Sequence, residues 1–77
     1  METEKFIRRF LSALKTRGFS DFSPENILYV KLEDNFIPKG HLKVKIKNEI
    51  WNFTADSVKI ENLVDIFADR VLRRLVP

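Results

Sequence analysis

Lysine at alternate positions is the pattern in this 77-residue chain with the clearest chemical meaning. Lys43, Lys45 and Lys47 alternate with aliphatic residues, as they would along one face of a β-strand. Residues two apart in a strand are about 6.6 to 6.8 Å apart, close to the roughly 7 Å between successive phosphates of an extended nucleic acid. Tyr29 would offer a ring for base stacking, and Lys31 a further positive charge. The alternative is a solvated sheet face whose charge prevents aggregation.

A group of apolar residues in a predicted loop is the second candidate for binding. Phe36, Ile37 and Pro38 lie near the tip of that loop, where an aromatic beside a β-branched residue is typical of an anchor that enters a partner's pocket. Because the core of so short a chain is small, we expect these residues instead to fold back over its open end. Ile27 and Ile50 are expected on an otherwise polar sheet face, which indicates that a protein surface covers them.

Residues suited to catalysis or metal binding are scarce, since the chain has one histidine and no cysteine. His41 is predicted to lie opposite Asp56, near Ser57, so a small nuclease or hydrolase using His41 is a third hypothesis. We interpret the two residues as an ion pair at a sheet edge, because no glycine elbow or oxyanion site accompanies them. Gly18 and Gly40 are too far apart in the sequence to form a phosphate-binding loop. We therefore expect no enzyme activity, no cofactor and no metal site.

Charge is distributed in blocks along the chain, whose net charge is +3. Segments 5–17 and 39–47 contain basic residues and no acidic ones, whereas segment 48–69 contains five acidic residues and one lysine. Such blocks steer an anionic partner or pair with each other inside the fold. If the first and last segments lie side by side as helices, the arginines of the first would pair with the acids of the last.

Composition limits the class of protein. With 44% hydrophobic residues the chain is too apolar for intrinsic disorder, yet charges interrupt it too often for a membrane span of about 20 residues. The residues after Met1 lack the apolar centre of a secretory signal, so we expect a cytoplasmic location. The length fits a single domain over residues 1–77.

The first segment predicts an amphipathic helix over residues 4–17. Thr3 is the expected N-cap, and Gly18 the residue whose left-handed conformation ends the helix, with Phe19 folding back onto the last turn. Apolar residues recur at helical spacing at Phe6, Ile7, Phe10, Leu11, Ala13 and Leu14.

The last segment predicts a second amphipathic helix, with acidic residues toward its start and arginines at its end, as the helix dipole favours. Asp56, Ser57 and Asn62 are alternative caps, so its start is open by several residues, and Pro77 is expected to stop it. Its apolar face comprises Ile60, Leu63, Val64, Phe67, Val71 and Leu75.

Between the helices the hydrophobic period changes from 3.6 to 2, after a tight turn expected at Ser23 and Pro24. Leu28, Val30 and Leu32 are expected on the buried face of the first strand. The predicted strands cover residues 27–33, 41–47 and 50–56, and a loop covers residues 34–40.

Asn48 and Glu49 are the candidate two-residue turn between the second and third strands, because Asn tolerates positive φ. This turn puts all the apolar residues of the second strand on one face and its lysines on the other. The expected pairs are Ile46 with Trp51, Lys45 with Asn52, Val44 with Phe53, Lys43 with Thr54, Leu42 with Ala55 and His41 with Asp56.

The order of elements is helix, strand, strand, strand, helix. A sheet with one apolar face and two helices with one apolar stripe each predict an α+β two-layer sandwich. In it both helices cover the same face of a three-stranded antiparallel meander. The other face is bare, and the lysines run down its central strand.

This α-β-β-β-α order resembles that of the double-stranded-RNA-binding domain and of the small HicA-type ribonuclease toxins, over most of the chain. Lys39, Gly40 and His41 fall near the place where the RNA-binding family has a groove-contacting loop with a histidine, which implies RNA contact there. That family opens its second helix with a lysine cluster, where this chain is mostly acidic, and the glycine, serine and histidine signature of the toxins is missing. The last helix of the toxins is similar to this chain at Lys59, Ile60, Leu63 and Ile66.

These patterns lead to two main hypotheses. The first is a non-catalytic interaction module, adaptor-like or inhibitor-like, that binds a protein partner or forms a homodimer through its bare sheet face and the 34–40 loop. The alternative is a nucleic-acid-binding protein that uses the lysine-rich face. Neither involves a membrane. The candidate partner-binding residues are Tyr29, Lys31, Phe36, Ile37, Lys43, Lys45, Lys47 and Ile50.

Overall fold

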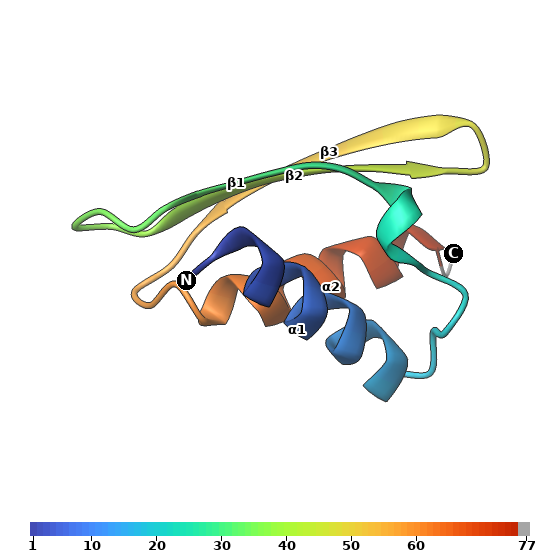
Figure 1. Ribbon diagram of the computed structural model, residues 1–77, viewed down its shortest axis with the longest axis horizontal. Helices are drawn as coiled ribbons and strands as arrows, with labels where there is room; N and C mark the ends of the chain where they lie inside the picture. Colours follow the sequence, from blue (N-terminus) through green and yellow to red (C-terminus); the bar gives the residue numbers. More distant parts are fainter. Residues whose placement is uncertain (76–77) are drawn as a thin grey trace.

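Two helices lie on one side of a three-stranded antiparallel sheet in the computed structural model, which describes residues 1–75 (Figure 1). The strands follow each other in space in the order β1-β2-β3. The predicted α+β sandwich, with a meander and both helices on one face, is therefore confirmed. The elements are α1 (Thr3–Thr16), the short 3-10 helix η1 (Pro24–Asn26), β1 (Ile27–Glu33), β2 (Lys39–Ile46), β3 (Glu49–Asp56) and α2 (Asn62–Leu75).

Helix α1 ends as its sequence predicts but begins differently. The N–H of Gly18, at φ +91°, donates to the carbonyl of Lys15 at 3.0 Å, and the N–H of Phe19 donates to that of Leu14 at 2.9 Å. This pair of bonds is a Schellman motif, which satisfies carbonyls that the helix leaves unpaired. At the other end the capping position is Glu2, without a side-chain hydrogen bond, and Thr3 is already helical, so the predicted Thr3 cap is wrong.

Helix α2 begins later than a cap at Asp56 or Ser57 would give, and Asn62, the third candidate cap, is itself the first helical residue. The residues before it form turns, in which the N–H of Asn62 donates to the carbonyl of Lys59 at 3.1 Å. The Asn62 side chain also donates to the hydroxyl of Ser57 at 3.1 Å, which ties the turn to the helix. Pro77, expected to stop the helix, lies outside the described residues.

The core fills the space between the helices and one sheet face, where aromatic rings of both helices meet. The rings of Phe6 and Phe67 pack edge to face at 5.9 Å, and Phe10 packs in the same way on Phe22 at 5.8 Å. The largest fully buried side chains are Phe6, Phe10, Leu14, Leu42, Val44, Leu63, Phe67 and Val71.

The helices also contact each other through two ion pairs. Arg17, at the end of α1, lies 3.1 Å from a carboxylate oxygen of Asp65 and 3.1 Å from one of Asp69. The hydrogen bond to Asp65, helped by the nearby Asp69, raises the pKa of Arg17. The expectation that arginines of the first helix pair with acidic residues of the last helix is confirmed for Arg17.

Helix α2 lies so close to the sheet at Gly40 that there is no room for a side chain. A Cβ atom at Gly40 would sit 2.9 Å from Cε2 of Phe67 and 3.2 Å from Cδ1 of Leu63. We expect Gly40→Ala to lower the free energy of unfolding by about 1–3 kcal/mol, the usual cost of overpacking a core. Denaturant unfolding followed by circular dichroism measures this change.

A second substitution tests the cause of that loss. Adding Phe67→Leu to Gly40→Ala removes the ring that the new methyl group meets. The double variant should then lose less free energy than the sum of the two single variants. Strict additivity would show that contact with Phe67 is not the reason for glycine at this position.

The turn between β2 and β3 lies one residue earlier than predicted. Lys47 and Asn48 form it, with φ of 51° and 68°, and Ile46 pairs with Glu49. A two-residue turn with positive φ at both positions matches the twist of the strands, and Asn is better suited to it than Glu. The partner of every residue in β2 is therefore shifted by two, which leaves the faces of β2 and β3 as predicted. In these two strands only the pairing was wrong.

A β-bulge at Leu28 interrupts the pairing of β1 with β2. Ile27 pairs with Val44 and Tyr29 with Lys43, so that Leu28 is an extra residue. Ile27 consequently packs against the core, and the side chain of Leu28 is 46% exposed. The expectation that Ile27 lies on the polar face and Leu28 in the core is wrong, because the bulge exchanges the faces of these two aliphatic neighbours.

Candidate functional site

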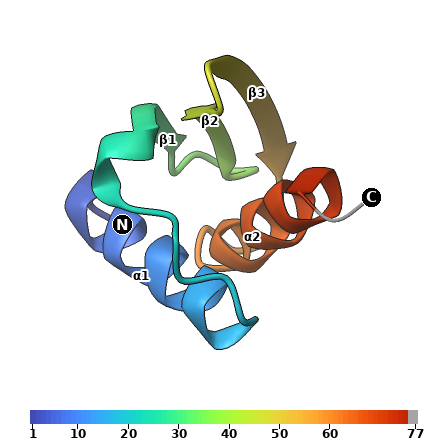
Figure 2. The ribbon, with the colours of Figure 1, turned by 90° about the vertical axis from the view of Figure 1, so that its right-hand side faces the viewer.

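One face of the sheet points away from the helices (Figures 1 and 2). By register and burial it carries polar side chains from all three strands. Its residues follow from the strand register and from the burial of their neighbours. We call this surface the open face. It comprises Tyr29, Lys31 and Glu33 of β1, Lys39, His41, Lys43 and Lys45 of β2, and Ile50, Asn52, Thr54 and Asp56 of β3.

Lysines run along the central strand of the open face. Lys43 and Lys45 lie where the sequence predicts, on the face opposite the fully buried Leu42 and Val44. Within residues 1–75 neither lysine forms an ion pair, so both ammonium groups are available to an anionic partner. Lys47 belongs to the turn and not to the strand, which removes it from the row.

The opposite end of the lysine row was missed from the sequence. The sequence predicts Lys39 in the loop, but it is the first residue of β2 and lies between Glu33 and Asp56 of the neighbouring strands. Continuing the alternation back from Lys43 through His41 would have found it. Lys31 of β1 contacts Glu33, with 3.3 Å between the ammonium nitrogen and a carboxylate oxygen. Charges at this end of the open face are thus partly compensated, and the uncompensated ones lie toward Lys45.

Two rings lie side by side in the middle of the open face. The ring of Tyr29, a residue 44% exposed, packs edge to face on that of His41 with their centres 5.4 Å apart. Nε2 of His41 lies 3.4 Å from Oδ1 of Asn52, and Thr54 is its cross-strand partner. The predicted pairing of His41 with Asp56 is wrong, because the actual turn shifts the register by two residues. The arrangement of a carboxylate-oriented histidine is therefore not formed.

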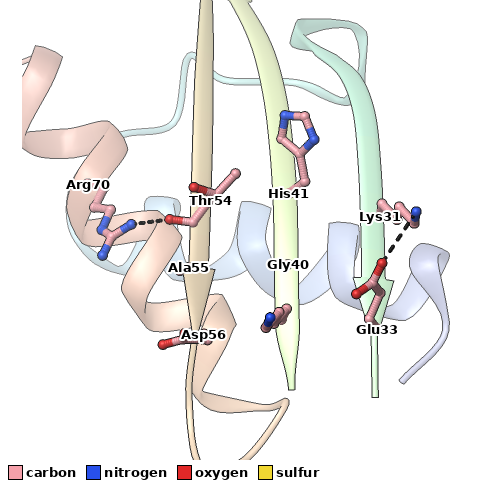
Figure 3. A pocket seen from close by; sticks show the side chains of 9 residues that line it. Lys31, Glu33, Gly40, His41, Thr54, Ala55, Asp56 and Arg70 are labelled. Atoms are coloured by element: carbon pink, nitrogen blue, oxygen red, sulfur yellow. Dashed lines mark hydrogen bonds and ion pairs between the residues drawn. The ribbon is translucent and has the colours of Figure 1, made fainter. Parts of the chain in front are cut away.

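An open hollow occupies the end of the open face where β1 and β3 finish (Figure 3). Arg70 reaches it from α2 and donates a hydrogen bond to the main-chain carbonyl of Thr54. This contribution from a helix was also missed, because it depends on where α2 packs. Three basic and two acidic side chains line the hollow, so its net positive charge is lower than that of the surface around Lys43 and Lys45. Its lining residues are Lys31, Glu33, Lys39, Gly40, His41, Thr54, Ala55, Asp56 and Arg70.

The predicted loop is shorter than expected, and its tip faces solvent. Phe36 is fully exposed and Ile37 is 51% exposed, whereas Pro38 is buried and its carbonyl accepts a hydrogen bond from the N–H of Ser57. The expectation that Phe36 folds back over the core is wrong, because Pro38 is the loop residue that packs inward. Val58, on the loop held by that bond, is 88% exposed and was not singled out from the sequence.

Ile50 is the one large aliphatic residue of the open face, where it lies opposite Lys45 and is 56% exposed.

Among the described residues no group of three or more histidine, aspartate or glutamate side chains is placed to hold a metal ion. Neither of the two described helices has the length and apolar character needed to cross a bilayer.

Comparison with protein-family models, characterised proteins and solved structures finds no match to this chain. The resemblance to the RNA-binding domain and to the toxins therefore extends only to the order of elements. The structure also places Lys39, Gly40 and His41 in strand β2, with Gly40 buried against α2, and not in a groove-contacting loop.

Proposed function

We propose that this protein is a non-catalytic binding module that holds single-stranded nucleic acid on its open face. The observation that carries this proposal is the exposed ring of Tyr29, which packs on the ring of the half-buried His41. Beside these rings lie the ammonium groups of Lys43 and Lys45, which form no ion pair within residues 1–75. Proteins that bind single strands combine aromatic surfaces for the bases with positive charge along the backbone. The open face supplies both within neighbouring positions of two strands.

The geometry favours a single strand over a duplex. Bases inside a duplex are stacked on each other, so a flat protein ring cannot reach their faces. The edge-to-face arrangement of Tyr29 and His41 presents two differently oriented ring surfaces to an unstacked base. Asn52 and Thr54 of β3 lie beside His41 and offer amide and hydroxyl groups to base edges.

The exposed ring of Tyr29 provides the direct test. We expect Tyr29→Ala to weaken binding of a fluorescent single-stranded oligonucleotide by about 1–3 kcal/mol, or roughly 5- to 150-fold in Kd, because one stacked base is lost. Fluorescence anisotropy at several salt concentrations measures the change, with RNA and DNA oligonucleotides in parallel.

The matched control is Tyr29→Phe, which keeps the ring and should bind nearly as tightly as the natural chain. A duplex of the same sequence should bind more weakly than either single strand. Equal binding of duplex and single strand, or an unchanged Kd for Tyr29→Ala, would contradict recognition on the open face.

A protein partner is the second candidate. The fully exposed ring of Phe36, with Ile37 beside it and Val58 on the adjoining loop, is an apolar surface that a monomer leaves in water. These loops are joined by the hydrogen bond from Ser57 to Pro38, so their tips lie at the same end of the molecule (Figure 1). This surface is separate from the central lysines, and a protein bound there would not compete with nucleic acid for them.

A further inference from the structure

The two outer strands of the sheet differ in whether other parts of the chain contact their outer edges. On β3, the guanidinium of Arg70 binds the outward carbonyl of Thr54, and the guanidinium of Arg74 lies 4.9 Å from the centre of the Trp51 ring. Figure 2 shows α2 next to β3. Arg70 of α2 therefore occupies an outward carbonyl near the end of this edge. Strand β1 pairs with β2 on one side only.

Two hydrogen bonds establish which way the backbone groups of the sheet point. The carbonyl of Thr54 points away from β2, because Arg70 binds it. In an antiparallel ladder, pairs that exchange hydrogen bonds alternate with pairs that do not, so the backbone groups of His41, the partner of Thr54, face β1. The carbonyl of Lys45, four residues further along β2, has the same orientation and accepts a hydrogen bond from Nδ2 of Asn26 beside β1.

The same alternation identifies the free groups of β1. His41 pairs with Lys31, so the N–H and C=O groups of Lys31 face β2, and those of Val30 and Leu32 face outward. Within residues 1–75 no backbone hydrogen bond from a turn, loop or helix reaches Val30 or Leu32. Because the bulge at Leu28 ends regular pairing, the free edge is a short segment, residues 29–33, with the exposed side chain of Leu28 beside it.

We propose that two copies of the chain associate through this free edge of β1, in antiparallel register about a two-fold axis at Val30. Unpaired edge groups are a template for a further strand, and a second β1 presents the same outward donors and acceptors. Face matching allows the axis at any residue of this segment, but an axis at Leu32 would run the pairing past Glu33, where β1 ends. An axis at Lys31 would put two lysines directly opposite each other, which is unfavourable.

With the axis at Val30, the N–H and C=O groups of the two Val30 residues bond to each other. Tyr29 then lies opposite Lys31 of the second copy, on the open face, where a ring and an ammonium group attract each other. We expect association to stop at two copies, because the pairing uses the β1 edge of both copies and Arg70 occupies the outward carbonyl of Thr54 on each β3 edge. The result is a closed dimer with a six-stranded sheet and one continuous open face, formed without nucleic acid.

Sedimentation velocity over a range of protein concentrations tests the proposal. Because the contact is small, we expect a reversible change from one chain to two within roughly the micromolar to millimolar range. Val30→Pro removes the outward N–H and should give a monomer at all these concentrations. Asn52→Pro is the matched control, since the N–H of Asn52 points outward on the β3 edge, away from the proposed contact, and this variant should still dimerise. Circular dichroism checks that both variants fold.

Disulfide trapping tests the register without relying on proline variants, since the chain contains no cysteine of its own. A mixture of Tyr29→Cys and Lys31→Cys proteins should form a cross-linked dimer under mild oxidation, because these positions face each other in the proposed dimer. Each variant alone should cross-link much less. A monomer at every concentration, growth beyond two chains, or stronger cross-linking of Lys31→Cys with itself would overturn the proposal. None of these outcomes depends on nucleic-acid binding.

Discussion

The double variant Lys43→Glu and Lys45→Glu is expected to bind a single-stranded oligonucleotide about 100-fold more weakly than the natural chain at about 50 mM salt. Each lysine that contacts a phosphate of a single strand adds about 0.7 to the slope of log K against log salt. Two lost contacts account for nearly two orders of magnitude at low salt, and the new carboxylates repel the strand further. Both lysines lie on the central strand and form no ion pair within the described chain, so their loss leaves no unpaired acid behind.

The matched control is Lys5→Glu with Lys15→Glu, which changes the net charge by the same amount on the exposed surface of α1. It should lower affinity much less and leave the salt dependence nearly unchanged, because those lysines lie in the other layer of the fold. Anisotropy titrations at several salt concentrations compare the two variants. Equal losses would mean that net charge and not the open face governs binding.

The largest effect on stability is expected from Phe67→Ala. Phe67 is fully buried, its ring packs on Phe6, and it closes over Gly40. Truncating such a ring costs about 3–5 kcal/mol, a large part of the total stability of a chain of this size. Chemical denaturation should show a much lower midpoint or no folded baseline at all.

Phe36→Ala is the matched control, since the chemical change is identical but the side chain is fully exposed. Its free energy of unfolding should stay within about 0.5 kcal/mol of the natural value. A comparable loss in the two variants would show that Phe36 packs against the domain in solution. If its stability is unchanged, the Phe36→Ala protein can be used to detect a partner that binds the loop.

The sequence predicted the two layers, helices and sheet, because the hydrophobic periodicity of each segment determines which of its sides is buried. Alternation in β2 and β3 assigns each side chain to a face, and that assignment survives an error of two residues in the register. The predicted position of the turn was wrong because lysine is not a residue type that indicates positive φ, so Lys47 could not be recognised as a turn residue. Lys47 adopts that conformation because its neighbour Asn48 and the twist of both strands favour it.

Other features depend on contacts between distant segments and could not be predicted. Ile27 and Leu28 are adjacent and similar in character, so only packing against the helices decides which of them is buried. The contact of Arg70 with Thr54 requires the actual position of α2, and the ring pair of Tyr29 and His41 requires the actual register. For the candidate site, residue types therefore predicted the lysines, whereas the hollow and the ring pair came only from three-dimensional structure.

Because the buried core residues and the open-face residues are different sets, the open face can be substituted without changing the core. The largest fully buried side chains all come from the helices and from the opposite side of β2. Tyr29, His41, Asn52 and Thr54 thus contribute little to folding, and their identities can be exchanged in combination while the scaffold persists. A randomised library at these four positions would yield soluble variants with new selectivities, as a few altered contacts are enough to retarget a small recognition domain.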